Sequence, residues 1–317
     1  MELLSETYYP VSGSITIYDL GTLIADAVRP TVTASFTIDI TEHQGESDIA
    51  TWSSGAITAY YATVDIDMSC SSFIDRYFLT LLDGTKLTRL GHREYLHAAG
   101  INSSTPTVVA QFFKDNQVTT VQVPSSATPT HTANGITSFD VSPDRYCDAS
   151  EGDLFAYTVT VGDRTQQYQI DHTGSIADPV LLFTNSFGCQ EIFIAWARRK
   201  SHRFSSARVP SSGAKKLNYQ VKETRTFEGD TGIIPPSMAH FAEDLLRSDE
   251  VYLFRDYGQD KQITLTDSKS ERTNEADDLA EFTFSYQYSQ RIQNVVFKNI
   301  DTSSGKIFDR SFDDTFN

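Results

Sequence analysis

Alternation of apolar and polar residues is the feature that most constrains the fold of this chain. Every second residue is apolar from residue 31 to 40, and Phe282, Phe284, Tyr286 and Tyr288 repeat the pattern near the end. Successive side chains of a β-strand point to opposite faces, so this period predicts sheets with one buried and one solvated face. Shorter runs of the same kind recur between these segments. We therefore expect a mainly β protein built from antiparallel β-sandwich or barrel-like units.

Chain length and the breaks in the alternation predict several units. A chain of 317 residues exceeds the usual size of one hydrophobic core. The alternation stops near residues 100–105 and again near residues 171–179. We expect, in order, an N-terminal β-rich domain with a short helix, a small β-sandwich, a β-sheet domain with one helix, and a C-terminal arm. The predicted bounds are residues 1–100, 101–177, 178–297 and 298–317.

Two segments have the apolar spacing of helices. The first follows Asp19, which can cap a helix, and ends before Pro30. The second covers about residues 237–248, after two prolines. Its apolar residues recur at i, i+3, i+4 and i+7, which predicts one buried face; they are Met238, Phe241, Ala242 and Leu245. We expect this helix to pack on a sheet that includes residues 282–288.

Charge and cysteine content exclude several classes of protein. Acidic residues number 42 against 26 basic ones, for a net charge of −16, which argues against nucleic acid and anionic membranes as partners. Cys70, Cys147 and Cys189 are far apart and form no C-x-x-C, so neither a disulfide framework nor a zinc site is predicted. The first residues lack the pattern of a signal peptide, and no apolar run reaches the length of a membrane span. We expect a soluble protein made in the cytoplasm.

Motifs of known catalytic sites are missing from the sequence. It contains no G-x-S-x-G, G-x-G-x-x-G, Walker A or H-E-x-x-H pattern. We therefore expect no enzymatic activity, no cofactor and no tightly bound metal. His92 and His97 are expected at the surface, and the acidic residues between Asp140 and Asp153 are expected to form turns rather than a calcium site. Trp52 is the aromatic residue best suited to an exposed contact.

Two segments are candidates for contacts between subunits. Residues 198–216 are basic and rich in serine, and we expect an exposed loop that meets an acidic face of the next subunit. A solvated loop without a partner is the alternative. The C-terminal arm carries phenylalanines spaced by four, which would form one stripe of a helix. The candidate interface residues are Arg198, Arg199, Lys200, Arg203, Lys215, Lys216, Phe308, Phe312 and Phe316.

Two sequence blocks resemble virion proteins of tailed phages and prophages of Bacteroides-type hosts. One is Tyr8-Tyr9-Pro10 with residues 15–24, and the other is residues 182–191. The resemblance implies a tail, baseplate or connector subunit of the virion without enzymatic activity. Its partners would be further copies of itself, arranged for instance as a ring, and other virion proteins. The competing hypothesis is a cell-surface β-sandwich protein that binds glycans through exposed aromatic residues.

Overall fold

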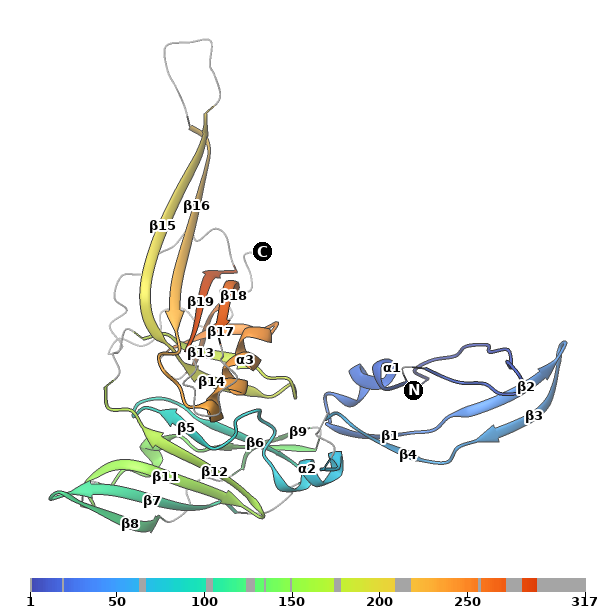
Figure 1. The fold of residues 1–317 in the computed structure, drawn as a ribbon, viewed down its shortest axis with the longest axis horizontal. Coiled ribbons are helices and arrows are strands. Elements are labelled where there is room, and N and C mark those ends of the chain that lie inside the picture. The colour runs from blue at the N-terminus through green and yellow to red at the C-terminus, as the bar shows by residue number, and fades with distance from the viewer. Residues whose placement is uncertain are drawn as a thin grey trace, which may run out of the picture.

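The structure is a computed structural model that describes residues 2–18, 20–62, 67–100, 105–123, 129–133, 135–148, 150–173, 178–208, 218–255, 258–271 and 281–289. This part of the chain is mainly β with several antiparallel sheets, as expected, and it contains three α-helices, of which the sequence predicted two. Figure 1 shows a body of sheets from which two slender segments project in different directions. One is the N-terminal part of the chain, and the other is a long hairpin.

The N-terminal arm comprises residues 2–62. The predicted short helix is present as α1 (Leu20–Val28). Strand β1 (Thr33–Phe36) pairs with β4 (Ile57–Tyr60), and β2 (Asp39–Gln44) pairs with β3 (Ser47–Ser53). The predicted continuous strand 31–40 is therefore split, and Ile38 N in the break donates to Ser54 Oγ at 3.0 Å. Val32, fully buried beside Ile74 of α2 (Cys70–Arg76), anchors the base of the arm.

The body begins with two sheets that share one core. The five-stranded sheet has the order β5 (Thr85–Thr88), β12 (Arg164–Ile170), β11 (Asp153–Val161), β7 (Thr107–Lys114) and β8 (Gln117–Val123). The three-stranded sheet has the order β6 (Tyr95–Ala99), β10 (Ile136–Asp140) and β9 (Pro129–Ala133), and the short helix η1 (Pro143–Arg145) follows β10. Stacked Tyr157 and Tyr168, with ring centroids 4.7 Å apart, lie in the core between them. Strands β5 and β6 lie before residue 100, whereas the other strands of their sheets follow it, so both sheets contain residues from each side of the predicted boundary. Independent folding of the predicted units stays a prediction.

The third large sheet carries the predicted helix. Its order is β14 (Gln190–Ile194), β13 (Val180–Thr184), β17 (Val251–Arg255), β18 (Gly258–Glu271), β19 (Glu281–Tyr288), β16 (Asn218–Asp230) and β15 (Trp196–Arg208), antiparallel throughout. After the turn η2 (Pro236–Met238), α3 (Ala239–Arg247) buries Phe241 and Leu245 in one cluster with Phe282 and Phe284. The predicted packing of this helix on the final strand is confirmed.

The basic hairpin, residues 196–230, corrects one expectation. Residues 198–208 were expected in a loop, but they belong to β15 and pair with β16 from Trp196↔Asp230 to Arg208↔Asn218. Backbone hydrogen bonds of the ladder hold such a strand even where its side chains are too polar to predict it. Within the described residues, β16 pairs with β19 from Thr226 to Asp230, and the described strands of the hairpin extend beyond the sheet (Figure 1).

Candidate assembly surfaces

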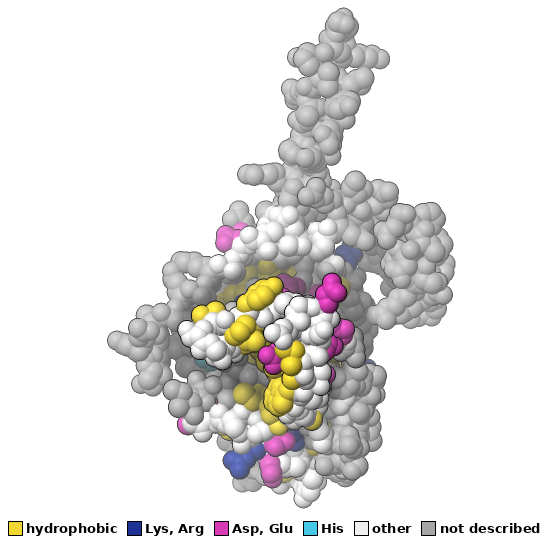
Figure 2. All heavy atoms as spheres, turned by 90° about the vertical axis from the view of Figure 1, so that its right-hand side faces the viewer, with side chains coloured by type: hydrophobic (Ala, Val, Ile, Leu, Met, Phe, Trp, Pro, Cys, Tyr) yellow, Lys and Arg dark blue, Asp and Glu magenta, His cyan; other side chains and the backbone are white. Residues whose placement is uncertain are grey.

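The N-terminal arm exposes most of the large apolar side chains that the structure places at the surface. Twelve of the nineteen in the described residues lie there: Leu3, Leu4, Tyr8, Tyr9, Val11, Ile15, Tyr18, Leu23, Ile40, Ile49, Trp52 and Tyr60. Figure 2 looks toward the side from which this arm projects and shows hydrophobic side chains gathered there, with acidic ones between them. Exposed apolar groups at this density mark contact surfaces in soluble proteins.

The β2–β3 hairpin of the arm is exposed along both strands. Trp52 lies directly opposite Ile40 in the ladder, so the two side chains share a face. Their exposed fractions are 57% and 42%. Exposure of Trp52 was expected and is confirmed, whereas its role in a contact stays a prediction. A two-stranded ribbon is marginally stable by itself in water, so a partner that covers Trp52 and Ile40 would stabilise it.

The two projecting segments carry opposite charge. Residues 1–62 contain eight Asp and Glu and one Arg, whereas residues 196–230 contain nine Lys and Arg and three Asp and Glu. The backbone places Arg198, Arg199, Lys200 and Arg203 along β15. Lys215, Lys216, Phe308, Phe312 and Phe316 lie outside the described residues. The basic segment was expected as an assembly surface from the sequence. The acidic arm was not, because its apolar residues alternate as they would in a buried strand.

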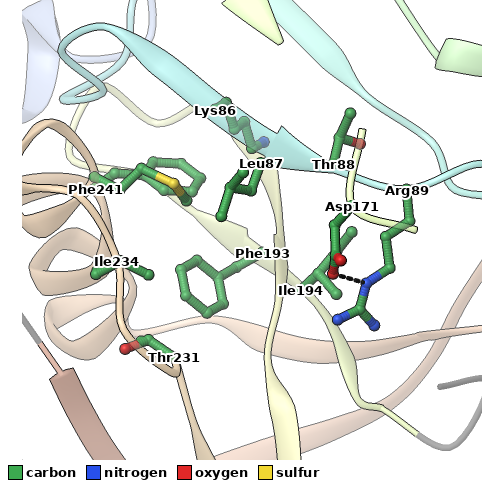
Figure 3. A pocket seen from close by; sticks show the side chains of 11 residues that line it. Lys86, Leu87, Thr88, Arg89, Asp171, Phe193, Ile194, Thr231, Ile234 and Phe241 are labelled. Atoms are coloured by element: carbon green, nitrogen blue, oxygen red, sulfur yellow. Dashed lines mark hydrogen bonds and ion pairs between the residues drawn. The ribbon is translucent and has the colours of Figure 1, made fainter. Parts of the chain in front are cut away.

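Ion pairs join the five-stranded sheet to the seven-stranded sheet. Arg89 at the end of β5 donates from Nε to Asp171 at 2.8 Å and from Nη1 to Asp178 at 2.7 Å. Figure 3 shows Arg89 on one side of a cavity, with the rings of Phe193 and Phe241 across from it. The cavity measures about 30 Å³. That volume is enough for water. Arg89 connects the end of β5 with the segment that leads into β13.

His97 is buried, so the expectation of a surface histidine is wrong for this residue. Its Nε2 lies 2.7 Å from the Gln190 carbonyl oxygen, and its Nδ1 lies 2.8 Å from Ser138 Oγ. A carbonyl only accepts, so Nε2 carries the proton in the neutral ring and Nδ1 accepts from the serine. Burial lowers the pKa of His97 to about 4. The ring thereby connects β6 and β10 with β14 as an uncharged link.

Carboxylates near the predicted acidic turns are bound by the protein's own groups. Asp140 Oδ2 accepts from Arg93 at 2.7 Å and from Arg145 at 2.8 Å. Asp144 Oδ1 accepts from Gly91 N at 2.8 Å, and Asp148 Oδ1 accepts from Ser150 N at 2.9 Å. Across the described ranges, no group of three or more His, Cys, Asp or Glu side chains could hold a metal ion.

Cysteines and helices add two further observations. All three cysteines are free. Burial raises the pKa of the Cys189 thiol to about 12, so it stays protonated at neutral pH. In the part of the chain that the structure describes, none of the helices combines the length and the apolar character needed to cross a membrane.

Distant likenesses to this chain are found among solved structures alone. No protein-family model matches the chain. No curated protein matches it either. Among solved structures, a chain from the tail of an empty GTA particle, computed with helical refinement and C6 symmetry, is similar at 13% identity and a TM-score of 0.25. The match covers 37% of this chain and 96% of that chain.

Proposed function

We propose that this chain is a non-enzymatic structural subunit of a phage-type tail, baseplate or connector. It would act by self-association and by docking other virion proteins. The observation that carries the proposal is the pair of projecting segments of opposite charge, the acidic N-terminal arm and the basic hairpin. The apolar side chains on the acidic arm add area that a partner would cover.

Opposite charges on two segments favour a head-to-tail contact between copies. A symmetric contact that pairs each segment with itself would bring like charges together, which costs several kcal/mol. A contact between the acidic arm of one subunit and the basic hairpin of the next is attractive instead. Contacts of this kind generate rings when the rotation closes and helical filaments when it does not.

The backbone of the basic hairpin offers a second source of attraction. Among the strands that the structure describes, β15 is the terminal one of the seven-stranded sheet, with no described neighbour along one edge. Such an edge presents unpaired amide and carbonyl groups to which a strand of another chain can add. An exposed β2–β3 ribbon on the next copy has the geometry for this pairing, and hydrogen bonds would then supplement the ionic and apolar contacts.

Absence of catalysis is part of the proposal. Its support is the setting of His97 and Glu191, two titratable groups with strongly shifted pKa values, which are buried where sheets meet. The glycan-binding alternative was predicted to use exposed aromatics, but Phe282, Phe284 and Tyr286 are buried in the cluster beneath α3. Those aromatics therefore give the alternative no support.

Charge reversal on each segment tests the head-to-tail contact. One variant carries Arg198→Glu and Arg199→Glu, and the other carries Glu42→Lys and Glu46→Lys, at exposed positions of the acidic arm. By sedimentation velocity at low salt, the parent should associate and each variant should remain monomeric. An equimolar mixture of the two variants should associate again. The unchanged acidic arm of the first variant can then meet the unchanged basic hairpin of the second.

The control is Asp163→Lys, which changes charge on an exposed turn of the body between β11 and β12. It should associate like the parent. A parent that stays monomeric at low salt, or variants that associate individually as the parent does, would contradict the proposed contact. Failure of the mixture to associate would show that the two segments do not face each other.

A further inference from the structure

The outward face of the five-stranded sheet combines uncharged polar side chains with exposed apolar ones such as Val109 and Phe113. Strand register aligns them in rows across β7, β11 and β12. One row contains Gln111, Ala156 and Gln169, and the next contains Thr158 and Gln167. Thr85 of β5 continues the second row, and its Oγ1 donates to Gln167 Oε1 at 3.2 Å. The opposite face of these strands is the apolar core.

Ala156 leaves a hollow in the middle of this face. It lies between two glutamines in adjacent strands, Gln111 on one side and Gln169 on the other, and both of these side chains are exposed. Because a methyl group is much shorter than the flanking amides, the surface dips over β11. The resulting hollow measures about 210 Å³. This is smaller than pockets of roughly 300–1,000 Å³ that enclose a whole small molecule, so it suits one ring of a longer ligand.

A β-bulge adds an aromatic side chain to the edge of the hollow. The register of β11 against β7 shifts between Leu154 and Ala156, which leaves Phe155 as the extra residue. Leu154 and Tyr157 point into the core, so Phe155 and Ala156 both lie on the outward side. Bulges commonly redirect a side chain in this way next to binding sites. Phe155 is 40% exposed and lines the hollow.

Charge is missing from this hollow, although the whole chain is strongly acidic. Among the described residues that line it, none is charged. Amide side chains donate and accept at once, which matches neighbouring hydroxyl groups that also do both. The face of an aromatic ring is electron-rich and attracts the polarised C–H groups of a sugar ring. We propose that the hollow over Ala156 binds one sugar ring of a neutral glycan, with Gln111 and Gln169 as hydrogen-bonding partners and Phe155 as the stacking surface.

Other classes of ligand fit this hollow less well. An anionic ligand would find no cation in the lining and would be repelled by a chain of net charge −16. A peptide strand adds to the edge of a sheet, whereas β11 lies between β7 and β12 and is not an edge strand. A neutral polyhydroxylated ring needs neither a counter-charge nor a free edge. The site is separate from both projecting segments, so it can function whether or not the subunits assemble.

Binding to defined oligosaccharides tests the assignment. The full chain is screened against multivalent neutral hexasaccharides of glucose, mannose, galactose, xylose and N-acetylglucosamine, and against lactose with its charged partner sialyllactose. We expect retention on at least one neutral glycan, no gain from the sialic acid, and little dependence on salt. Saturation-transfer NMR with the free oligosaccharide at millimolar concentration then identifies the sugar protons that lie against the protein.

Three variants locate the binding on the sheet. Ala156→Leu fills the hollow and should weaken binding by more than about tenfold, and the exposed pair Gln111→Ala with Gln169→Ala should do the same without touching the core. Gln122→Ala is the matched control, because this exposed glutamine lies on the same face but outside the hollow. Circular dichroism confirms that each variant is folded.

Several results would overturn the proposal. They are no retention of any neutral glycan, unchanged binding by both the filled and the amide-free variants, or an equal loss in Gln122→Ala. If Ala156→Leu instead abolishes a dimer seen by light scattering, the face belongs to a second copy of the chain and not to a sugar. The salt-dependent self-association of the parent is measured in a separate experiment. Failure of glycan binding therefore leaves the proposed assembly untouched, and failure of assembly leaves glycan binding untouched.

Discussion

Lys86 Nζ lies 2.6 Å from Glu94 Oε2, and the two side chains are only 5% and 0% exposed. The same ammonium group lies over the ring of Phe241, 4.7 Å from its centroid. Lys86 belongs to β5 and Phe241 to α3, so one cation connects the five-stranded sheet with the helix of the seven-stranded sheet. Burial raises the pKa of Glu94, and the nearby Lys86 opposes that rise. The link between the two sheets therefore depends on both Lys86 and Glu94.

Removal of Lys86 alone should destabilise the protein strongly. Lys86→Met leaves the Glu94 carboxylate buried without its cation, a situation that costs about 3–5 kcal/mol. The free energy of unfolding in a urea titration measures the loss. The double variant Lys86→Met with Glu94→Leu should recover part of it, because no unpaired charge remains. Losses that simply add in the double variant would show that the two groups are not coupled.

Phe241 should be the most sensitive position of α3. Its side chain is fully buried, with ring centroids 5.6 Å from Phe183 and 5.7 Å from Phe193. Phe241→Ala should lower the free energy of unfolding by about 3–5 kcal/mol, as truncation of buried aromatics does. His240→Ala, at the exposed neighbouring position, should change it by less than about 0.5 kcal/mol. Similar values for the two variants would place the helix outside the core.

Glu191 should make stability depend on pH near neutrality. Burial raises its pKa from 4.5 to about 7. Between these values the folded state holds the proton more often than the unfolded state, so stability falls as pH rises through the window. Glu191→Gln keeps an oxygen that can accept from Asn185 Nδ2 but carries no charge. We expect the variant to gain up to about 3 kcal/mol over the parent at about pH 8, and little at about pH 4.

His97 makes stability rise with pH, which is opposite to the effect of Glu191, so the parent must be compared with Glu191→Gln at each pH. Its pKa is lowered from 6.5 to about 4, so its contribution is present above pH 6.5 and is lost as pH falls toward 4. Parent and Glu191→Gln share that loss. The difference between their unfolding free energies across this pH range therefore isolates Glu191. A difference that stays constant with pH would contradict the raised pKa.

The sequence predicted those elements whose pattern records a buried face. Strand β19 and helix α3 were recognised because Phe282, Phe284, Met238 and Leu245 follow the periods of a strand and a helix, and all four are buried. Residues 198–208 of β15 were expected in a loop, because a ribbon that extends beyond its sheet has no core to impose alternation. β15 pairs with β16 through backbone hydrogen bonds, which leave little trace in the pattern of side chains.

The surfaces were less predictable than the cores for a physical reason. A hollow such as that over Ala156 depends on which residues become neighbours across three strands, and on the bulge at Phe155. Gln111 and Gln169 are 58 positions apart in the chain, so no local pattern connects them. Exposure of Ile40 likewise depends on the arm's projection from the body, whereas its place in the alternation of residues 31–40 indicates burial.

Trp52 should report assembly and contribute much of its free energy. It is 57% exposed on the acidic arm, opposite Ile40, and tryptophans at such positions are often the dominant residues of interfaces. As protein concentration rises at low salt, its fluorescence should shift to shorter wavelength, because contact with a neighbour removes water from the indole. Trp52→Phe should abolish the shift, and Trp52→Ala should raise the dissociation constant of self-association by about tenfold or more. Screening by 0.5 M NaCl should reduce the shift in the parent, since part of the attraction is ionic. An emission maximum that does not change with concentration, while sedimentation shows association, would place the interface away from the β2–β3 ribbon.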